Sequence, residues 1–187
     1  MNAALNSLIS RRRGLIALMA LMSCALPLVV RAQTPPEDIV LTIAGVGVKR
    51  VTDSKGPQTG AAASPDTAEF TLAALAALPQ HTISTTAPWH DGERSYSGPL
   101  LRDVLAAANA RATQARFVAL NDYKIDIPLE DAQLFPVVLA IRLDGKPMLV
   151  RDKGPLFVMY PFDKHPELKQ TKYYSRCVWQ LRRIELK

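Results

Sequence analysis

The sequence predicts an α+β domain with mixed sheets, a partly barrelled core and short helices. Many short runs of β-branched and alternating apolar residues are separated by turn signals, as expected for a sheet of several strands. The few segments with helical spacing lie between these runs rather than alternating regularly with them, which favours α+β over α/β. The clearest element is a hairpin with Asp144-Gly145 at its tip, because both residues of such a turn favour positive φ.

Residues 1–32 have the pattern of a secretory signal peptide. Three arginines at 11–13 precede an apolar run over 14–30, and Val30 and Ala32 occupy the −3 and −1 positions of a cleavage site. Cleavage after Ala32 would place the mature protein in the periplasm. The alternatives are an uncleaved membrane anchor, a lipoprotein and a twin-arginine signal, which carries folded, cofactor-loaded proteins.

Removal of residues 1–32 leaves 155 residues, enough for one domain with a hydrophobic core. Four of the 23 basic residues and none of the 17 acidic ones lie in this segment, so the formal net charge falls from +6 to +2. The remaining chain has no Lys/Arg stripe with interleaved aromatic residues. We therefore expect no nucleic-acid partner.

The first part of the mature chain, 33–69, is expected to hold an N-terminal strand and a flexible connector. The strand covers 39–46, with an extension over 48–52, and the connector over 53–66 is rich in Gly, Pro, Ser, Thr and Ala. The main domain is expected to cover 70–187.

The main domain begins with a short helix over 71–78, capped by Thr71. A strand over 81–87 then runs into a loop over 88–92. Gly98-Pro99 opens the best helix of the chain, with an apolar stripe through Leu101, Val104 and Leu105. The elements expected after it are strands over 115–120 and 123–127, a helical turn over 128–133, the hairpin 137–143 with 146–150, a polar stretch over 162–172 and a last strand over 176–186.

Common catalytic patterns are missing from the sequence. It has no GxSxG elbow and no Gly-rich phosphate loop after a strand, and its three histidines, His81, His90 and His165, are too scattered to indicate a zinc site. Cys177 is alone in the mature chain, so no intrachain disulfide is expected there, and a buried small apolar role fits this thiol.

The candidate binding residues are aromatic and polar side chains near predicted turns and strand ends. A flat, nitrogen-rich heterocycle needs a ring to stack on and in-plane donors and acceptors. Each residue also has a structural explanation, such as a turn pair, a core aromatic or a weak surface ion pair. The candidates are Trp89, Asn121, Asp122, Tyr123, Arg151, Asp152, Lys153 and Tyr160.

Several motifs together resemble a known family. In chain order they are Thr86-Ala87-Pro88-Trp89, Gly92, Tyr96-Ser97-Gly98-Pro99-Leu100-Leu101, Ala119-Leu120-Asn121-Asp122-Tyr123, Ile127-Pro128, Asp144-Gly145, Arg151-Asp152-Lys153-Gly154-Pro155 and Trp179-Gln180-Leu181. This pattern is similar to the small periplasmic proteins built on the molybdopterin-binding domain of sulfite oxidases. The resemblance covers about 70–187 and implies the sulfite oxidase fold with a pocket shaped for a pterin.

The chain departs from the catalytic members of this family at one position. Those members use a cysteine before the Trp-containing loop to bind molybdenum, whereas this sequence has Thr85 and Thr86 there. A neutral hydroxyl is a poor substitute for a soft thiolate ligand. The resemblance therefore implies a metal-free pterin ligand, with molybdopterin as the alternative.

Relatives without the cysteine include periplasmic pterin-binding proteins that signal to membrane enzymes controlling cyclic di-GMP. The resemblance thus implies a non-catalytic sensor whose partner is the periplasmic domain of such an enzyme. In that role Trp89 or Tyr123 would stack on the ring, Asp122 would accept hydrogen bonds from its 2-amino and N3 edge, and Arg151 and Lys153 would contact ligand oxygens. A molybdopterin-dependent oxidoreductase and a structural adaptor without a ligand are the alternatives.

Overall fold

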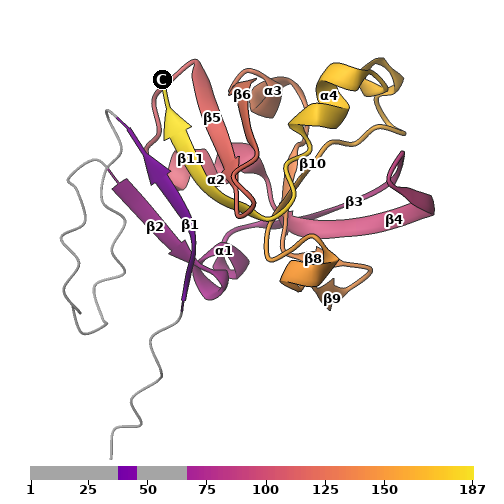
Figure 1. Cartoon of the computed structure of the whole chain (residues 1–187), viewed down its shortest axis with the longest axis horizontal. Coiled ribbons are helices and arrows are strands. Elements are labelled where there is room, and N and C mark those ends of the chain that lie inside the picture. Colours follow the sequence, from indigo (N-terminus) through magenta and orange to yellow (C-terminus); the bar gives the residue numbers. More distant parts are fainter. Residues whose placement is uncertain (1–37, 46–66) are drawn as a thin grey trace, which may run out of the picture. The chain divides into compact units, whose positions relative to one another are not determined.

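A five-stranded mixed sheet joins the N-terminal and C-terminal strands of the described chain (Figure 1). The computed structural model describes residues 38–45 and 67–187, all within one unit, Thr34–Lys187. The predictions for 1–32, for the extension over 48–52 and for the connector over 53–66 lie outside the described residues. Within the described ranges, no helix is long and apolar enough to cross a membrane.

The five-stranded sheet has the order β2-β1-β11-β5-β6. β1 pairs in parallel with β11, and the other neighbours are antiparallel. β1 lies between two hydrogen-bonded neighbours, so the N-terminal strand is part of the same domain as the rest of the sheet. The domain predicted from the sequence began only at residue 70. The strands are β1 (Ile39–Ala44), β2 (Thr67–Thr71), β5 (Gln114–Ala119), β6 (Lys124–Pro128) and β11 (Leu181–Leu186).

A second sheet has the order β3-β4-β8-β9, and β7 forms a separate pair with β10. The predicted hairpin is confirmed for β8 and β9, and its tip residues Asp144 and Gly145 have φ of 49° and 76°. β7 passes so close to Gly98 of β4 that any Cβ there would overlap the Leu139 carbonyl group. These strands are β3 (Gln80–Ala87), β4 (His90–Pro99), β7 (Val138–Ala140), β8 (Arg142–Leu143), β9 (Lys146–Pro147) and β10 (Phe157–Met159).

The helices are short. Thr71 caps the first one, since its Oγ1 accepts a hydrogen bond from the Ala74 N–H at 3.1 Å, as predicted. The predicted stripe Leu101, Val104 and Leu105 is the buried side of α2. The helical elements are α1 (Leu72–Ala77), α2 (Leu101–Ala107), α3 (Asp131–Leu134), α4 (Thr171–Arg176) and the 3-10 helices η1 (Val150–Asp152) and η2 (Pro166–Leu168).

β4 and the last strand differ from their predicted bounds, and β2 and α4 were not predicted. β4 occupies much of the predicted loop, and its first half is polar and exposed, so no apolar alternation marked it as a strand. The last strand starts at Leu181 rather than Arg176, because α4 covers 171–176 and Gln180 has a φ of 53°. The mixed sheets and short helices nevertheless confirm the predicted α+β class.

Candidate functional site

An aromatic cluster surrounds Trp89, which lies at the turn between β3 and β4. Five rings have centroids 5.8–6.5 Å from the Trp89 ring: His90, Phe157, Phe162, Tyr174 and Trp179. They come from β4, β10, the segment after β10, α4 and the segment before β11. The half-buried Trp89 therefore serves as the centre of this cluster and is flanked by protein rings on several sides.

Trp179 is the exposed ring of this cluster. It is 39% exposed, and its ring centroid lies 6.2 Å from that of Phe157 beneath it. The Nζ of Lys153 lies 5.7 Å from the Trp179 ring centroid. An exposed indole next to a cation is suited to bind a flat ring that carries oxygen atoms.

Gln180 fixes both members of this pair. Its N–H donates to the Lys153 carbonyl oxygen at 2.9 Å, and its side-chain amide donates to the Val150 carbonyl oxygen at 2.7 Å. Its own carbonyl oxygen accepts a hydrogen bond from the Leu120 N–H at 2.9 Å. Gln180 thus ties the segment after η1 and the β5–β6 turn to the residue that follows Trp179.

The β5–β6 turn places Tyr123 beside the same C-terminal segment. The Tyr123 hydroxyl donates to the Ser175 carbonyl oxygen at 3.0 Å, and the residue is 43% exposed. Asn121 has a local role, since its Oδ1 accepts a hydrogen bond from the Tyr123 N–H at 3.1 Å. Asp122, with a φ of 61°, forms an ion pair with Arg182 at 2.8 Å.

Arg151 lies at the surface, and its predicted contact with a ligand stays a prediction. Its side chain is 80% exposed, and its Nε lies 3.6 Å from the Asp152 carboxylate. This is the weak surface ion pair that the sequence offered as a structural explanation. Lys153, by contrast, is half-buried and reaches over Trp179. The two cations of this stretch therefore have different surroundings.

Tyr160 is a core residue, and its contact with a ligand stays a prediction. It has no exposed surface, and its hydroxyl donates to Asp131 Oδ2 at 2.8 Å. Arg176 Nη1 donates to the same oxygen at 2.6 Å. Burial, followed by the charge of Asp131, raises the pKa of Tyr160. The hydroxyl is thus a fixed structural donor.

Three residues of the aromatic cluster were not predicted from the sequence as site residues: His90, Tyr174 and Trp179. The signal for Trp179 was its place in the Trp179-Gln180-Leu181 motif. His90 Nε2 lies 2.5 Å from the Tyr96 hydroxyl, and burial raises the pKa of Tyr96 to about 12. Within the described chain, Trp89 Nε1 and His90 Nδ1 are buried and have no hydrogen-bond partner.

Thr85 and Thr86 belong to a closed network with Asp163. Thr85 is fully buried, and its Oγ1 accepts a hydrogen bond from the Asp163 N–H at 3.2 Å. The Thr86 N–H and hydroxyl donate to the Asp163 carboxylate at 2.6 and 2.8 Å. Lys169, 2.7 Å away, and then Thr86 lower the pKa of Asp163 to about 2. Both threonines therefore have protein partners.

These residues do not fit a thiolate-ligated molybdenum. The hydroxyls near Asp163 are neutral and hard, whereas molybdenum in the resembled enzymes takes a soft sulfur ligand. Cys177 is buried, and burial raises the pKa of its thiol. Across the described ranges, no three or more His, Cys, Asp and Glu residues are grouped to hold a metal ion. Trp179 with Lys153 over its ring, and Tyr123 on the β5–β6 turn, offer exposed aromatic surface and a cation to a flat ring.

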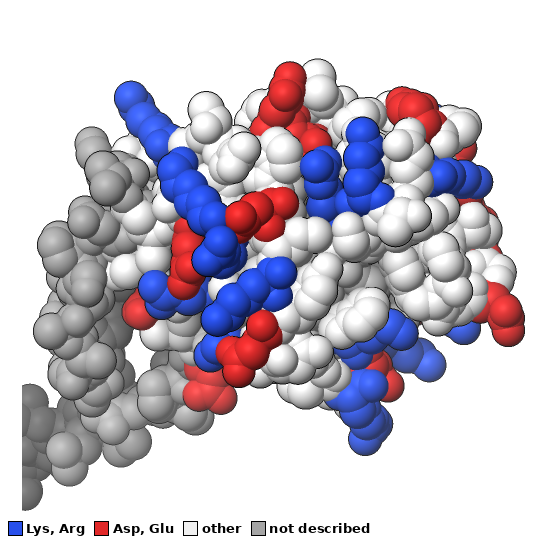
Figure 2. Space-filling view, turned by 45° about the horizontal axis from the view of Figure 1, so that its top comes forward, with Lys and Arg blue, Asp and Glu red and all other residues white. Residues whose placement is uncertain are grey.

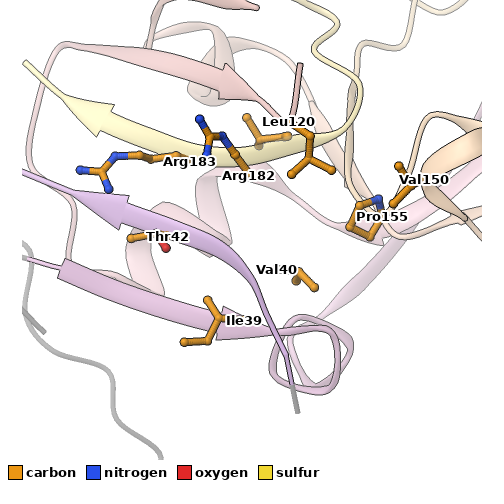
Figure 3. Close-up of a pocket in the computed structure, with 9 residues that line it drawn as sticks. Ile39, Val40, Thr42, Leu120, Val150, Pro155, Arg182 and Arg183 are labelled. Carbon is orange, nitrogen blue, oxygen red and sulfur yellow. The ribbon is translucent and has the colours of Figure 1, made fainter. Parts of the chain in front are cut away.

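A groove of about 380 Å³ is lined by residues of the paired strands β1 and β11 and of three other segments (Figure 3). Arg182 and Arg183 are on its β11 side, and the Arg182 Nε donates to the Ala119 carbonyl oxygen at 3.2 Å. Apart from these two arginines, Thr42 is the one polar lining residue, so the groove offers shape and charge rather than catalytic groups. The other residues that line it are Ile39, Val40, Leu120, Val150, Pro155 and Leu181.

Charges of both signs are interspersed on the face shown in Figure 2. In the five-stranded sheet and at the C-terminal residue, Asp126 pairs with Arg116 at 2.9 Å and with Lys187 at 2.7 Å, and Arg183 pairs with Glu185 at 3.0 Å. The absence of a nucleic-acid partner stays a prediction from the sequence.

Comparison with known proteins supports the fold. No family model matches the chain, and no curated protein matches it. Among solved structures it is similar to the sulfane dehydrogenase SoxCD from Paracoccus pantotrophus, with a TM-score of 0.55 and 16% sequence identity over 82% of this chain. The match covers 39% of the SoxCD chain, so this protein spans about two-fifths of that length. The likeness confirms the expected sulfite oxidase-like, mixed α+β fold.

Proposed function

We propose that this protein is a periplasmic, non-catalytic pterin-binding protein that regulates a membrane enzyme of cyclic di-GMP signalling. The observation that carries the proposal is the network of Thr85, Thr86 and Asp163. By the sequence resemblance, Thr85 and Thr86 correspond to the metal-binding cysteine of the catalytic members, and here both threonines bond to Asp163. The absence of the thiolate favours binding of a pterin without molybdenum.

The exposed rings suggest how the pterin binds. Trp179 and Tyr123 offer exposed aromatic surface. Trp89 is packed among five rings and contacts the Trp179 ring edge-to-face. Lys153 and Asp122 would contact the oxygen and amino groups of the ligand. Each such charge-assisted contact contributes about 1.5–3 kcal/mol when it is desolvated.

A second function, that of a molybdopterin-dependent oxidoreductase, is favoured by one observation, the likeness to a sulfane dehydrogenase. In that case the cofactor would supply the redox chemistry, and Trp179 and Lys153 would bind its pterin part. Metal analysis separates the two functions, because they require the same fold but differ in molybdenum content.

Purification from the periplasm of the native host under anaerobic conditions tests the proposal. We expect extracted ligand with pterin fluorescence and no stoichiometric molybdenum by elemental analysis. About one molybdenum atom per chain would contradict the proposal and support the oxidoreductase. Protein without any pterin would contradict both functions.

Cellular cyclic di-GMP tests the regulatory part separately. We expect deletion of the protein to change the cyclic di-GMP level, and a plasmid copy of the wild type to restore it. A Trp179→Ala copy that reaches the periplasm in equal amount should fail to restore it. An unchanged level after deletion would contradict the regulatory role while leaving pterin binding to be judged by the extraction.

A further inference from the structure

β3 forms an open edge of the β3-β4-β8-β9 sheet, and its free backbone groups can be identified. The carbonyl oxygens of Ser95 and Ser97 in β4 accept hydrogen bonds from Asp144 and Ile141 at 2.8 and 2.9 Å, on the β8 side of the strand. Their register partners in β3 are Ser84 and Thr82. Ser84 and Ser95, like Thr82 and Ser97, are therefore non-hydrogen-bonded pairs of the antiparallel ladder. In such pairs the N–H and C=O groups of both residues point away from the partner strand. Ser84 and Thr82 therefore present these groups to the open edge.

Asp163 caps one end of this edge. The Thr86 N–H, two residues beyond Ser84, donates to the Asp163 carboxylate at 2.6 Å, which agrees with the outward direction of the even-numbered residues. The same alternation places the backbone groups of Gln80 outward. Three successive outward positions, Gln80, Thr82 and Ser84, are thus left beside the capped Thr86.

β3 lacks the features that protect the other open edges of the described sheets. β2 carries Glu69, β6 carries Lys124 and Asp126, and β9 consists of Lys146-Pro147. β7 and β10 are bridged on their outer sides to Leu100 and Trp179. β3 has eight residues, none of them Lys, Arg, Asp, Glu or Pro. Charges and prolines on edge strands normally prevent pairing between chains, so an uncharged open edge favours it.

We propose that β3 is a dimerisation strand that pairs antiparallel with β3 of a second copy of this chain. The pairing places Thr82 on the two-fold axis, opposite its own counterpart, and Gln80 opposite Ser84 of the second copy. An antiparallel strand is self-complementary about such an axis, and without charges in β3 no like charges face each other. A register centred on Ser84 would need the Thr86 N–H as a donor to the second copy. That N–H already donates to Asp163, which favours the register centred on Thr82.

Disulfide trapping tests both the partner and the register. In the proposed dimer the two copies of Thr82 form a hydrogen-bonded pair with Cα atoms about 5.5 Å apart, within the range of a disulfide. Thr82→Cys should therefore give a covalent dimer on mild oxidation. Ser84→Cys is the matched control, because its two copies lie four residues apart along the strands, about 13 Å. Cross-linking of Ser84→Cys as fast as Thr82→Cys would overturn the register.

Sedimentation equilibrium of the uncross-linked protein tests the interface itself. We expect a dimer for the wild type, a dissociation constant raised at least tenfold by Thr82→Lys, and no change for Gln114→Lys, an exposed position on β5. Because Thr82 is exposed, the lysine is compatible with the folded monomer. A monomeric wild type at high concentration would overturn the proposal, even if β3 then paired with another protein. A Thr82→Lys dimer as tight as the wild type would overturn it as well.

Discussion

Trp179 combines two properties that no other residue of the aromatic cluster has together. It is 39% exposed, and Lys153 reaches over its ring at 5.7 Å. Trp89 is more central and more covered, so its loss would disturb packing as well as binding. A substitution at Trp179 is therefore expected to change ligand binding with little effect on folding.

Trp179→Ala is expected to weaken pterin binding by about 5- to 150-fold, because one stacked ring contributes about 1–3 kcal/mol. Fluorescence titration with 7,8-dihydroneopterin measures the change. Leu134→Ala is the control, since Leu134 is 62% exposed on α3 and should leave affinity unchanged. Equal pterin affinities of the wild type and Trp179→Ala would contradict stacking of the ligand on Trp179.

Tyr160→Phe tests the structural role of the hydroxyl. The variant removes a buried hydrogen bond to Asp131 and leaves the ion pair with Arg176, so we expect a loss of about 1.5–3 kcal/mol in the free energy of unfolding. Urea denaturation measures this loss, and the pterin affinity should stay the same. A large drop in affinity without loss of stability would identify Tyr160 as a ligand contact.

Asp163→Asn is expected to destabilise the protein in a pH-dependent manner. The pKa of Asp163 is lowered to about 2, so its ionised form stabilises the fold above its ordinary value of 3.8, and this contribution is lost as the pH falls toward 2. The difference in melting temperature between wild type and variant should therefore be larger at pH 6 than at pH 2.5. A difference that grows on acidification would contradict the assigned role.

Among the elements, the close approach of β7 to β4 depends on a missing side chain at Gly98. A Cβ at Gly98 would overlap the Leu139 backbone, whereas nothing lies within 4 Å of a Cβ at Gly92 in the turn between β3 and β4. Neither strand can move away easily, since β4 pairs with β3 and β8, and β7 pairs with β10. This close approach holds the second sheet against the β7–β10 pair.

Gly98→Ala is expected to prevent stable folding or to cost more than about 3 kcal/mol, as overpacking against backbone does. Gly92→Ala, at a φ of 71°, should cost only about 1–2 kcal/mol from backbone strain. Thermal unfolding followed by circular dichroism compares the two. Similar melting temperatures would show that β7 adapts to the extra methyl group.

The sequence predicted elements well where local chemistry determines them. The Thr71 cap, the apolar stripe of α2 and the Asp144-Gly145 turn depend on neighbouring residues, and all three are confirmed. β4 and α4 were missed, because their exposed polar residues carry no apolar period and their formation depends on pairing and packing with distant segments.

For the whole molecule, the candidate site could be predicted only in part. Trp89, Tyr123 and Lys153 were singled out from the sequence, but the role of Trp179 depends on contacts among segments far apart in the chain. The burial of Tyr160 likewise depends on α3 and α4, which bring Asp131 and Arg176 to its hydroxyl. Such long-range packing leaves no local pattern in the sequence.

Binding of a pterin without a metal can be measured in a single titration. Protein stripped of ligand and shown by elemental analysis to be free of molybdenum is titrated with 7,8-dihydroneopterin by isothermal calorimetry. We predict saturable binding of one pterin per chain that Trp179→Ala weakens. No binding without metal, with binding restored only by molybdopterin, would contradict metal-free pterin binding and identify a molybdenum-dependent protein.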